Sequence, residues 1–451
     1  MSAALTDFAP NHYGDAGTKR RLRLAMYVAL APFGLALLGY RGAIGGDAAG
    51  GWLAFGLVFA PFLALALAYI RATYRGSTPG IKNDGVQVHE LSGRRVGAYL
   101  LGTAITSLYV ILYWFPGALT GVVQVMEPLS QALRKGPADQ WFFYGFLYTA
   151  AVIVMGIRMI YRYRHNKYQI FRTLSVMFFQ LAFAFVLPAL LRAFNQPEFY
   201  FTYFWPLKYD YLFPGSFEYL WKQSGGVGMF MFGWGVIASF VLTPLLTWRF
   251  GKRWYCSWVC GCGALANTFG DPWRHLTFKD SRSWRFEKVA IHTILVTCLV
   301  MTIAVTVGQL LHFKAEWPYQ LGGFLKGWYG FVVGAVLSGV VGTGLYPVLG
   351  PRVWCRNFCP MAALLGLTQK IGRFRIRVKP DMCISCGNCT TYCEMGIDVR
   401  SYAQSNTSFT RSSCVGCGMC AHVCPRGVLR LENAAPIASD KRRQGIDAVD
   451  F

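Results

Sequence analysis

Two four-cysteine motifs near the C-terminal end of the sequence carry its most specific chemistry. Each has the spacing C-x2-C-x2-C-x3-C, which suits a cubane [4Fe–4S] cluster because three closely spaced thiolates can surround one face of a compact inorganic core. The fourth cysteine lies a helical step further on, where it reaches the neighbouring cluster. We therefore predict one cluster on Cys383, Cys386, Cys389 and Cys424, and a second on Cys414, Cys417, Cys420 and Cys393.

A pair of zinc sites is the main alternative for these motifs. A zinc knuckle needs only two cysteines, so the third and fourth cysteines at regular steps would have no explanation. Two clusters held by one small domain instead indicate electron conduction, with entry near one cluster and exit from the other.

A second signal is a repeated C-x3-C pair, formed by Cys256 and Cys260 and again by Cys355 and Cys359. A spacing of four places both thiols on one face of a helical turn. A helix N-terminus and nearby arginines would favour the thiolate form. Four thiolates from two matched turns could hold a third Fe–S cluster or another metal centre. Redox-active or structural thiols and a zinc site are the alternatives.

The two pairs belong to a longer internal repeat, in which residues 253–261 parallel residues 352–360 at a distance of 99 residues. Both copies follow an apolar stretch and continue into small residues typical of a tightly packed helix. The first copy departs from the second at Gly261, where the second copy has a proline, and at Cys262, which aligns with a methionine. This asymmetry argues against Cys262 as a ligand.

The surrounding composition is that of a polytopic membrane protein, with 54% hydrophobic, 16% aromatic and only 14% charged residues. We predict an all-α membrane domain of about eight transmembrane helices, carrying a small C-terminal α+β ferredoxin domain. A proline-glycine pair at 116–117 should kink the third span. The expected spans are 24–40, 52–70, 98–125, 141–160, 171–194, 227–248, 289–311 and 327–349.

The 44 Lys and Arg residues exceed the 21 Asp and Glu residues, and the net charge is +23. With the N-terminus inside, 36 of the 44 basic residues fall on the inner side, as the positive-inside rule requires. Both termini are therefore expected in the cytoplasm of a bacterial inner membrane. Clustered cysteines in that reducing compartment indicate metal ligands rather than disulfides. No nucleic acid partner is expected.

We expect four regions along the chain. Residues 1–226 form an N-terminal transmembrane region that ends in an aromatic outer loop, and residues 227–379 form the transmembrane region with the repeated turns. The ferredoxin domain covers 380–432, and 433–451 form a flexible tail. The aromatic loop is expected to anchor the protein at the lipid headgroups, or else to dock a redox partner or cover a quinone pocket.

The eight-cysteine pattern resembles that of a two-cluster bacterial ferredoxin, except that Glu394 stands where a proline commonly follows the fourth cysteine. An acid there should lower the potential of the adjacent cluster. Together with the C-x3-C turns on membrane helices, the pattern over residues 225–430 resembles the NapH/NosR family of membrane ferredoxins, which includes CcoG-like proteins. Cys355-x3-Cys359-Pro360 matches the motif of that family in full.

This resemblance implies an electron-transfer subunit, in the manner of a quinol dehydrogenase, that exchanges electrons with a quinone and with a redox protein partner. The direction of electron flow stays open. The alternative is an accessory or regulatory membrane ferredoxin that reduces metal ions or assists assembly of a respiratory complex. A structural anchor within a larger complex is a third hypothesis.

Overall fold

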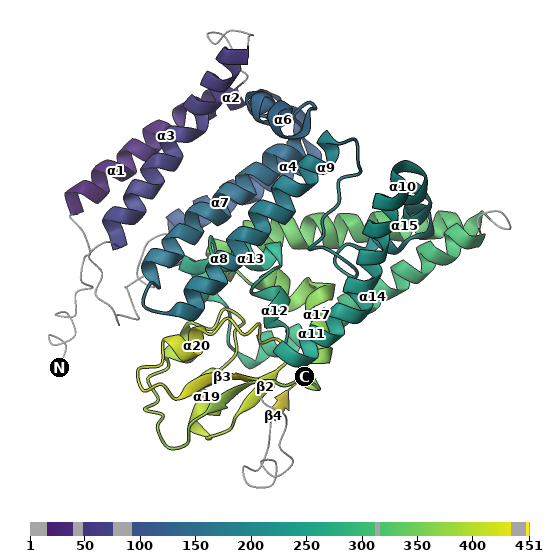
Figure 1. Ribbon diagram of the computed structural model, residues 1–451. Coiled ribbons are helices and arrows are strands. Elements are labelled where there is room, and N and C mark those ends of the chain that lie inside the picture. The colour runs from purple at the N-terminus through teal and green to yellow at the C-terminus, as the bar shows by residue number, and fades with distance from the viewer. Residues whose placement is uncertain (1–15, 39–47, 75–92, 312–315, 434–447, 451) are drawn as a thin grey trace. The chain divides into compact units, whose positions relative to one another are not determined.

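The computed structural model describes residues 16–38, 48–74, 93–311, 316–433 and 448–450 (Figure 1). The chain divides into two compact units. The first comprises Met1–His89 and Val110–Asn195, and the second comprises Glu90–Tyr109 and Gln196–Phe451. All twelve cysteines singled out as ligands lie in the second unit.

Seven helices in the described residues are long and apolar enough to cross a membrane, which indicates a multi-pass membrane protein. These helical stretches are Gly50–Tyr74, Val96–Trp114, Gln140–Arg162, Lys167–Ala193, Gly226–Phe250, Ser281–Leu311 and Trp317–Gly344. Each overlaps one of the expected spans, and together they confirm a helical membrane domain of the expected kind.

The expected first span, 24–40, differs from the other seven. It is described as α1 (Ala16–Ala29) and α2 (Ala31–Leu37), with a break at Leu30. Pro32 stands in the first turn of α2 and has no N–H with which to continue the helical ladder. Neither helix alone has the length of a membrane span, and residues 39 and 40 lie outside the described residues.

The first unit has its core among the aromatic side chains of α3 and α7. Phe59 and Phe146, one from each helix, have ring centroids 5.0 Å apart. The kink expected at residues 116–117 is confirmed, because α4 stops before Pro116 and a short 3-10 helix follows. The elements after α2 are α3 (Ala48–Tyr74), α4 (Val96–Trp114), η3 (Pro116–Leu119), α5 (Thr120–Val125), α6 (Glu127–Arg134), α7 (Gln140–Arg162), α8 (Lys167–Leu181), η4 (Ala182–Val186) and α9 (Leu187–Ala193). Most of α4, up to Tyr109, is assigned to the second unit.

Helices α14 and α15 of the second unit lie side by side (Figure 1). Gly308 and Gly322 allow this close approach, since a Cβ atom at Gly322 would lie 3.0 Å from the carbonyl oxygen of Ala304. The helices from Tyr209 to Lys370 are η5 (Tyr209–Leu212), α10 (Pro214–Ile237), η6 (Ala238–Leu242), α11 (Thr243–Phe250), α12 (Arg253–Cys256), α13 (Gly261–Asn267), η7 (Asp271–Leu276), α14 (Ser281–Leu311), α15 (Trp317–Tyr329), η8 (Gly330–Gly344), α16 (Tyr346–Leu349), η9 (Trp354–Phe358) and α17 (Pro360–Lys370).

The aromatic segment after α9 packs in part against its own unit. Phe204 and Trp205 are less than a tenth exposed. The indole N–H of Trp205 donates to the Thr302 hydroxyl near the middle of α14, at 3.2 Å. The carbonyl of Thr202 accepts a hydrogen bond of 2.7 Å from the hydroxyl of Tyr255, beside the first cysteine pair. This segment therefore folds back into its unit.

The C-terminal region is the expected α+β domain. Its sheet has the strand order β3-β1-β2-β4, and β1 pairs antiparallel with both β3 and β2. Strand β4 lies inside the expected flexible tail, where it pairs parallel with β2, while 434–447 and 451 lie outside the described residues. The elements are β1 (Phe374–Val378), α18 (Asn388–Thr391), α19 (Val399–Gln404), β2 (Phe409–Arg411), α20 (Met419–His422), β3 (Leu429–Asn433) and β4 (Ala448–Asp450).

Candidate iron–sulfur centres

The two C-x3-C segments, hereafter the paired turns, begin with equivalent glycines. Gly251 has φ +70° and Gly350 has φ +89°, and each follows the last residue of a helix, α11 or α16. Only glycine adopts this conformation without strain. A side chain would also find no space at Gly251, where a Cβ atom would lie 2.6 Å from the Cβ atom of Phe374. The chain thus leaves both helices in the same direction.

Matched backbone hydrogen bonds follow in each paired turn. The N–H of Cys260 donates to the carbonyl of Tyr255 at 2.8 Å, and the N–H of Cys359 donates to the carbonyl of Trp354 at 3.0 Å. Each of these cysteines has an extended backbone and immediately precedes a helix, α13 or α17. The sequence repeat is therefore also a structural repeat.

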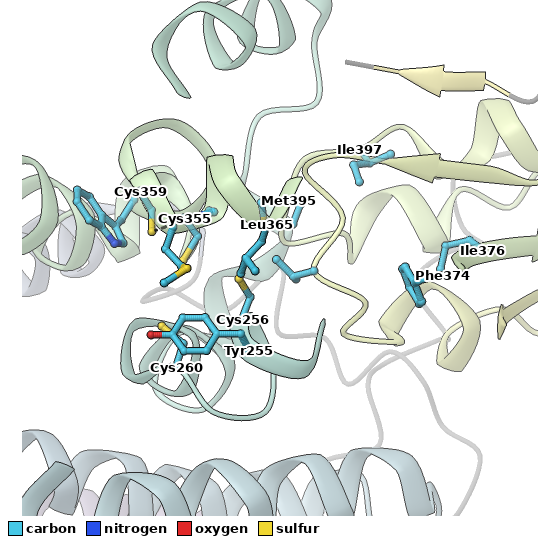
Figure 2. Packing of buried hydrophobic residues seen from close by; sticks show 14 of the residues in the cluster. Tyr255, Cys256, Cys260, Cys355, Cys359, Leu365, Phe374, Ile376, Met395 and Ile397 are labelled. Atoms are coloured by element: carbon cyan, nitrogen blue, oxygen red, sulfur yellow. Dashed lines mark hydrogen bonds between the residues drawn. The ribbon is translucent and has the colours of Figure 1, made fainter. Parts of the chain in front are cut away.

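The four thiols of the paired turns lie together in the buried core of the second unit, on facing segments (Figure 2). Each of the four residues is only 5–6% exposed. Burial and the thiols of Cys260 and Cys355 raise the pKa of Cys256 to about 12, against the opposing effect of the Lys252 ammonium. Burial and the other three thiols likewise raise the pKa of Cys359. The predicted set is thus brought together.

The surroundings of the paired turns suit a metal–sulfur group. Buried thiols with raised pKa values need strong positive charge to become thiolates, and iron supplies such charge. The Arg352 guanidinium lies with Nη1 3.5 Å from the Cys355 sulfur, and its Nε–H has no partner among the described residues. No three His, Cys, Asp or Glu side chains in the described ranges stand close enough for a single metal ion.

Cys262, which the comparison of the two repeats argued against as a ligand, contacts Cys260 of the paired turns. A hydrogen bond with Cys262, followed by burial, raises the pKa of the Cys260 thiol well above its usual value. Position 262 is one of the points at which the two copies of the repeat differ, and this asymmetry was the available signal. Its side chain belongs to the immediate surroundings of the paired turns.

The two halves of the ferredoxin region repeat each other at an interval of 31 residues. Corresponding positions adopt the same left-handed backbone conformation, with φ between +58° and +78°, so that each loop can turn tightly around its cysteines. The matched pairs are Ser385 and Gly416, Gly387 and Gly418, and Gly396 and Gly427.

The first predicted ligand set lines one hollow, as a cluster site requires. Val428 donates its backbone N–H to the Cys424 sulfur at 3.4 Å, which is the kind of bond that stabilises a cluster thiolate. Cys386 is exposed at the surface, and two exposed arginines, Arg400 and Arg426, line the rim. The cysteines in the hollow are Cys383, Cys386, Cys389 and Cys424.

The thiols of the second predicted set also lie close to one another. Burial, together with the thiols of Cys417 and Cys393, raises the pKa of Cys414 to about 12. Burial raises the pKa of Cys420 well above its usual value, and the thiols of Cys417, Cys414 and Cys393 add to the effect. Ile397 donates its N–H to the Cys393 sulfur at 3.4 Å, matching the bond to the fourth cysteine of the other half. Cys393, the fourth cysteine of the first half, thus lies among the thiols of the second set.

Direct hydrogen bonds connect the loop of the second cysteine set to the first of the paired turns. The buried ammonium of Lys252 donates to the carbonyl of Ser412 at 2.8 Å, and the hydroxyl of Ser257 donates to the carbonyl of Val415 at 2.7 Å. Both acceptors flank a cysteine of the second set. This set therefore lies next to the paired turns, whereas the first set opens to the surface.

Gln369 of α17 joins the same elements. Its amide nitrogen donates to the carbonyls of Arg411 and Cys414 at 2.8 and 3.1 Å, and its oxygen accepts the backbone N–H of Lys252 at 2.6 Å. Sequence reasoning missed both Gln369 and Lys252. Lys252 drew attention only as part of a basic loop, and nothing in the local sequence distinguishes Gln369.

Comparisons with known proteins agree with this reading of the cysteines. Residues 376–431 match a 4Fe-4S dicluster domain. Residues 232–279 and 332–379, which contain the two paired turns, each match a 4Fe-4S binding domain. The fold and the cysteine sites thus define an iron–sulfur electron-transfer protein with multiple membrane helices.

Among curated proteins, the chain is 26% identical over 177 residues to the putative electron transport protein YccM of Escherichia coli, a match that covers 38% of this chain and 48% of that protein. The chain thus spans about half the length of this relative. It is also 24% identical over 210 residues to the uncharacterized protein MJ0750 of Methanocaldococcus jannaschii, covering 47% of this chain and 84% of that protein. No solved structure matches the chain.

Proposed function

We propose that the protein conducts electrons through three [4Fe–4S] clusters. The paired turns would hold one through Cys256, Cys260, Cys355 and Cys359. The two ferredoxin clusters would be held by the crossed sets described above. The observation that supports the proposal is the pair of hydrogen bonds from Lys252 and Ser257 to the loop of the second ferredoxin set. These bonds place that loop beside the four buried thiols of the paired turns. Such an arrangement gives an ordered series from the exposed Cys386 to the membrane region.

The proposed partner in the membrane is a quinone. Oxidation of a quinol releases two electrons and two protons, and the clusters would accept the electrons one at a time because each is a one-electron carrier. The resemblance to NapH/NosR-type proteins supports quinol as the donor, and the description of YccM as a putative electron transport protein is consistent with it. A redox protein would then exchange electrons at the exposed first ferredoxin cluster.

The ferredoxin region is proposed to face the bacterial cytoplasm. The loops on its side of the membrane carry the excess of basic residues, and such loops stay inside. This argument depends on the loops after the second span, so it holds whether or not α1 and α2 together cross the membrane.

The number of clusters can be measured on protein purified without oxygen. Three [4Fe–4S] clusters require about twelve irons and about twelve sulfides per chain, with three sets of EPR signals on reduction. A Cys355→Ser variant should lose about four irons. A Cys298→Ser variant is the matched control, since Cys298 is equally buried but bonds to the carbonyl of Pro206. About eight irons in the unmodified protein would exclude the third cluster.

The quinone partner requires a separate test. Addition of a reduced ubiquinol or menaquinol analogue to the oxidised protein should bleach the cluster absorbance, and the Cys355→Ser variant should lose this response. Stoichiometric reduction of a metal ion, with no response to any quinol, would instead establish the accessory function.

A further inference from the structure

Glu394 lies at the centre of a buried ion network in the second unit. Its side chain is fully buried. One carboxylate oxygen lies 3.0 Å from Nη2 of Arg352, and the other lies 2.7 Å from Nη1 of Arg274. Both guanidinium groups are at most 1% exposed. A single carboxylate thus joins two buried cations.

Each of these arginines also reaches a cysteine sulfur. Nη1 of Arg352 lies 3.5 Å from the sulfur of Cys355 in the paired turns. Nη1 of Arg274 lies 4.0 Å from the sulfur of Cys417 in the second ferredoxin set. The contacts therefore form a continuous path from one proposed cluster site to the next, with Glu394 in the middle.

The charges in the network are balanced. Asp271 pairs with Arg274 at 2.8 Å, so two carboxylates accompany two guanidinium groups. Asn267 tightens the arrangement, because its side-chain oxygen accepts from Arg352 at 2.9 Å and its carbonyl lies 3.5 Å from Arg274 Nη2. Removal of one member would leave an uncompensated buried charge. Glu394 is the carboxylate in this network that contacts both arginines.

We propose that Glu394 is a positioning residue that holds Arg352 and Arg274 against cysteine ligands of two neighbouring clusters and thereby sets the reduction potentials of both. This inference rests on the proposed function, since it needs a cluster in the paired turns. Reduction adds one electron to a cluster, so a nearby guanidinium stabilises the reduced form and a nearby carboxylate opposes it. The acid does not act on one cluster alone, as its position after Cys393 suggested.

The test replaces the carboxylate by its neutral isostere in the complete membrane protein. In Glu394→Gln, two guanidinium groups lose their shared counter-charge. EPR-monitored redox titration should show positive shifts for the paired-turn cluster and the second ferredoxin cluster. A tenfold change in the ratio of reduced to oxidised cluster corresponds to 59 mV for a one-electron couple. The exposed first ferredoxin cluster should shift least.

Glu432→Gln provides the matched control. It removes the same charge from the same region, where Glu432 pairs with Arg375 and Arg377 on the sheet surface at 3.4 and 3.2 Å. Its potentials should equal those of the unmodified protein. A Glu394→Gln variant with full iron content and unmoved potentials would overturn the inference and leave the proposed function intact. Unmodified protein with about eight irons would overturn the proposed function itself.

A second variant keeps the test decisive if Glu394→Gln does not retain its clusters. The double change Glu394→Gln with Arg274→Gln removes one charge of each sign and restores the balance. It should retain more iron than the single variant, and its second ferredoxin cluster should return towards the original potential. A double variant that loads no better, or whose potentials equal those of the single variant, would refute the role assigned to Glu394.

Discussion

The two equivalent glycines of the ferredoxin halves provide a matched comparison. Gly396 has φ +68° and Gly427 has φ +61°, so alanine at either position meets the same backbone strain. Their surroundings differ. A Cβ atom at Gly396 would collide with the carbonyl oxygen of Phe278 and with Nη1 of Arg356, whereas a Cβ atom at Gly427 would have nothing within 4 Å. Gly396 therefore marks a close contact between the ferredoxin loop and the segment before α14.

The expected free-energy costs follow from these two terms. The left-handed conformation costs a non-glycine residue about 1–2 kcal/mol, which applies to both substitutions. Overpacking adds about 1–3 kcal/mol at Gly396 alone, because the colliding atoms include a backbone carbonyl that cannot rotate away. Gly427→Ala should therefore lose about 1–2 kcal/mol and Gly396→Ala about 2–5 kcal/mol.

Denaturant titration of detergent-solubilised, cluster-loaded protein can distinguish the two variants. Loss of the cluster absorbance reports unfolding of the ferredoxin region, and midpoints compared under identical conditions report the difference. The contact at Gly396 also holds Arg356, which donates to the carbonyl of Phe278 at 2.6 Å. Equal losses for the two alanine variants, or a larger loss for Gly427→Ala, would refute the assigned contact.

Two further changes probe the surroundings of the paired turns. Tyr255→Phe removes the hydrogen bond to the Thr202 carbonyl and should lower stability by about 1–3 kcal/mol, measured by thermal unfolding; an unchanged midpoint would show that the aromatic segment is not held there. Arg356→Gln breaks the buried pair with Glu287, at 2.6 Å, and should cost about 3–5 kcal/mol. Addition of Glu287→Gln should recover part of that loss, and no recovery would contradict the pairing.

The cysteine motifs could be recognised in the sequence because the spacing between neighbouring cysteines indicates cluster binding. Three cysteines at intervals of three fix one loop, and the crossed fourth cysteine follows from the same rule. The paired turns were recognisable from the 99-residue repeat, whose glycines, Gly251 and Gly350, share one backbone conformation. The assignment of ligands to particular clusters remains a prediction until iron is measured.

The residues that form hydrogen bonds and ion pairs around the cysteine sites were not predictable, because their partners lie far away in sequence. Lys252 bonds to a carbonyl 160 residues away, and Gln369 accepts from a residue 117 positions earlier. No local pattern marks such contacts. The sequence indicated only that an acid at Glu394 lies close to a cluster, and its two arginine partners come from segments 42 residues and further away.

The hydropathy pattern also predicted only part of the membrane region. It located seven helical stretches because length and apolar content define them. It could not place the aromatic segment around Thr202 and Trp205, since aromatic side chains suit both an interface and a packed interior. Nor could it show the break at Leu30, where a proline interrupts an otherwise apolar run.

The hydrogen bonds from Lys252, Ser257 and Gln369 to the ferredoxin loops have a kinetic consequence. Some electron carriers deliver charge by swinging a tethered domain between two docking positions, and their turnover then depends on the viscosity of the medium. Here the backbone carbonyls at and beside Cys414 accept hydrogen bonds from side chains of the same unit. The carriers would stand at constant separations, so electron passage between them would proceed by tunnelling at fixed distance, independent of domain diffusion.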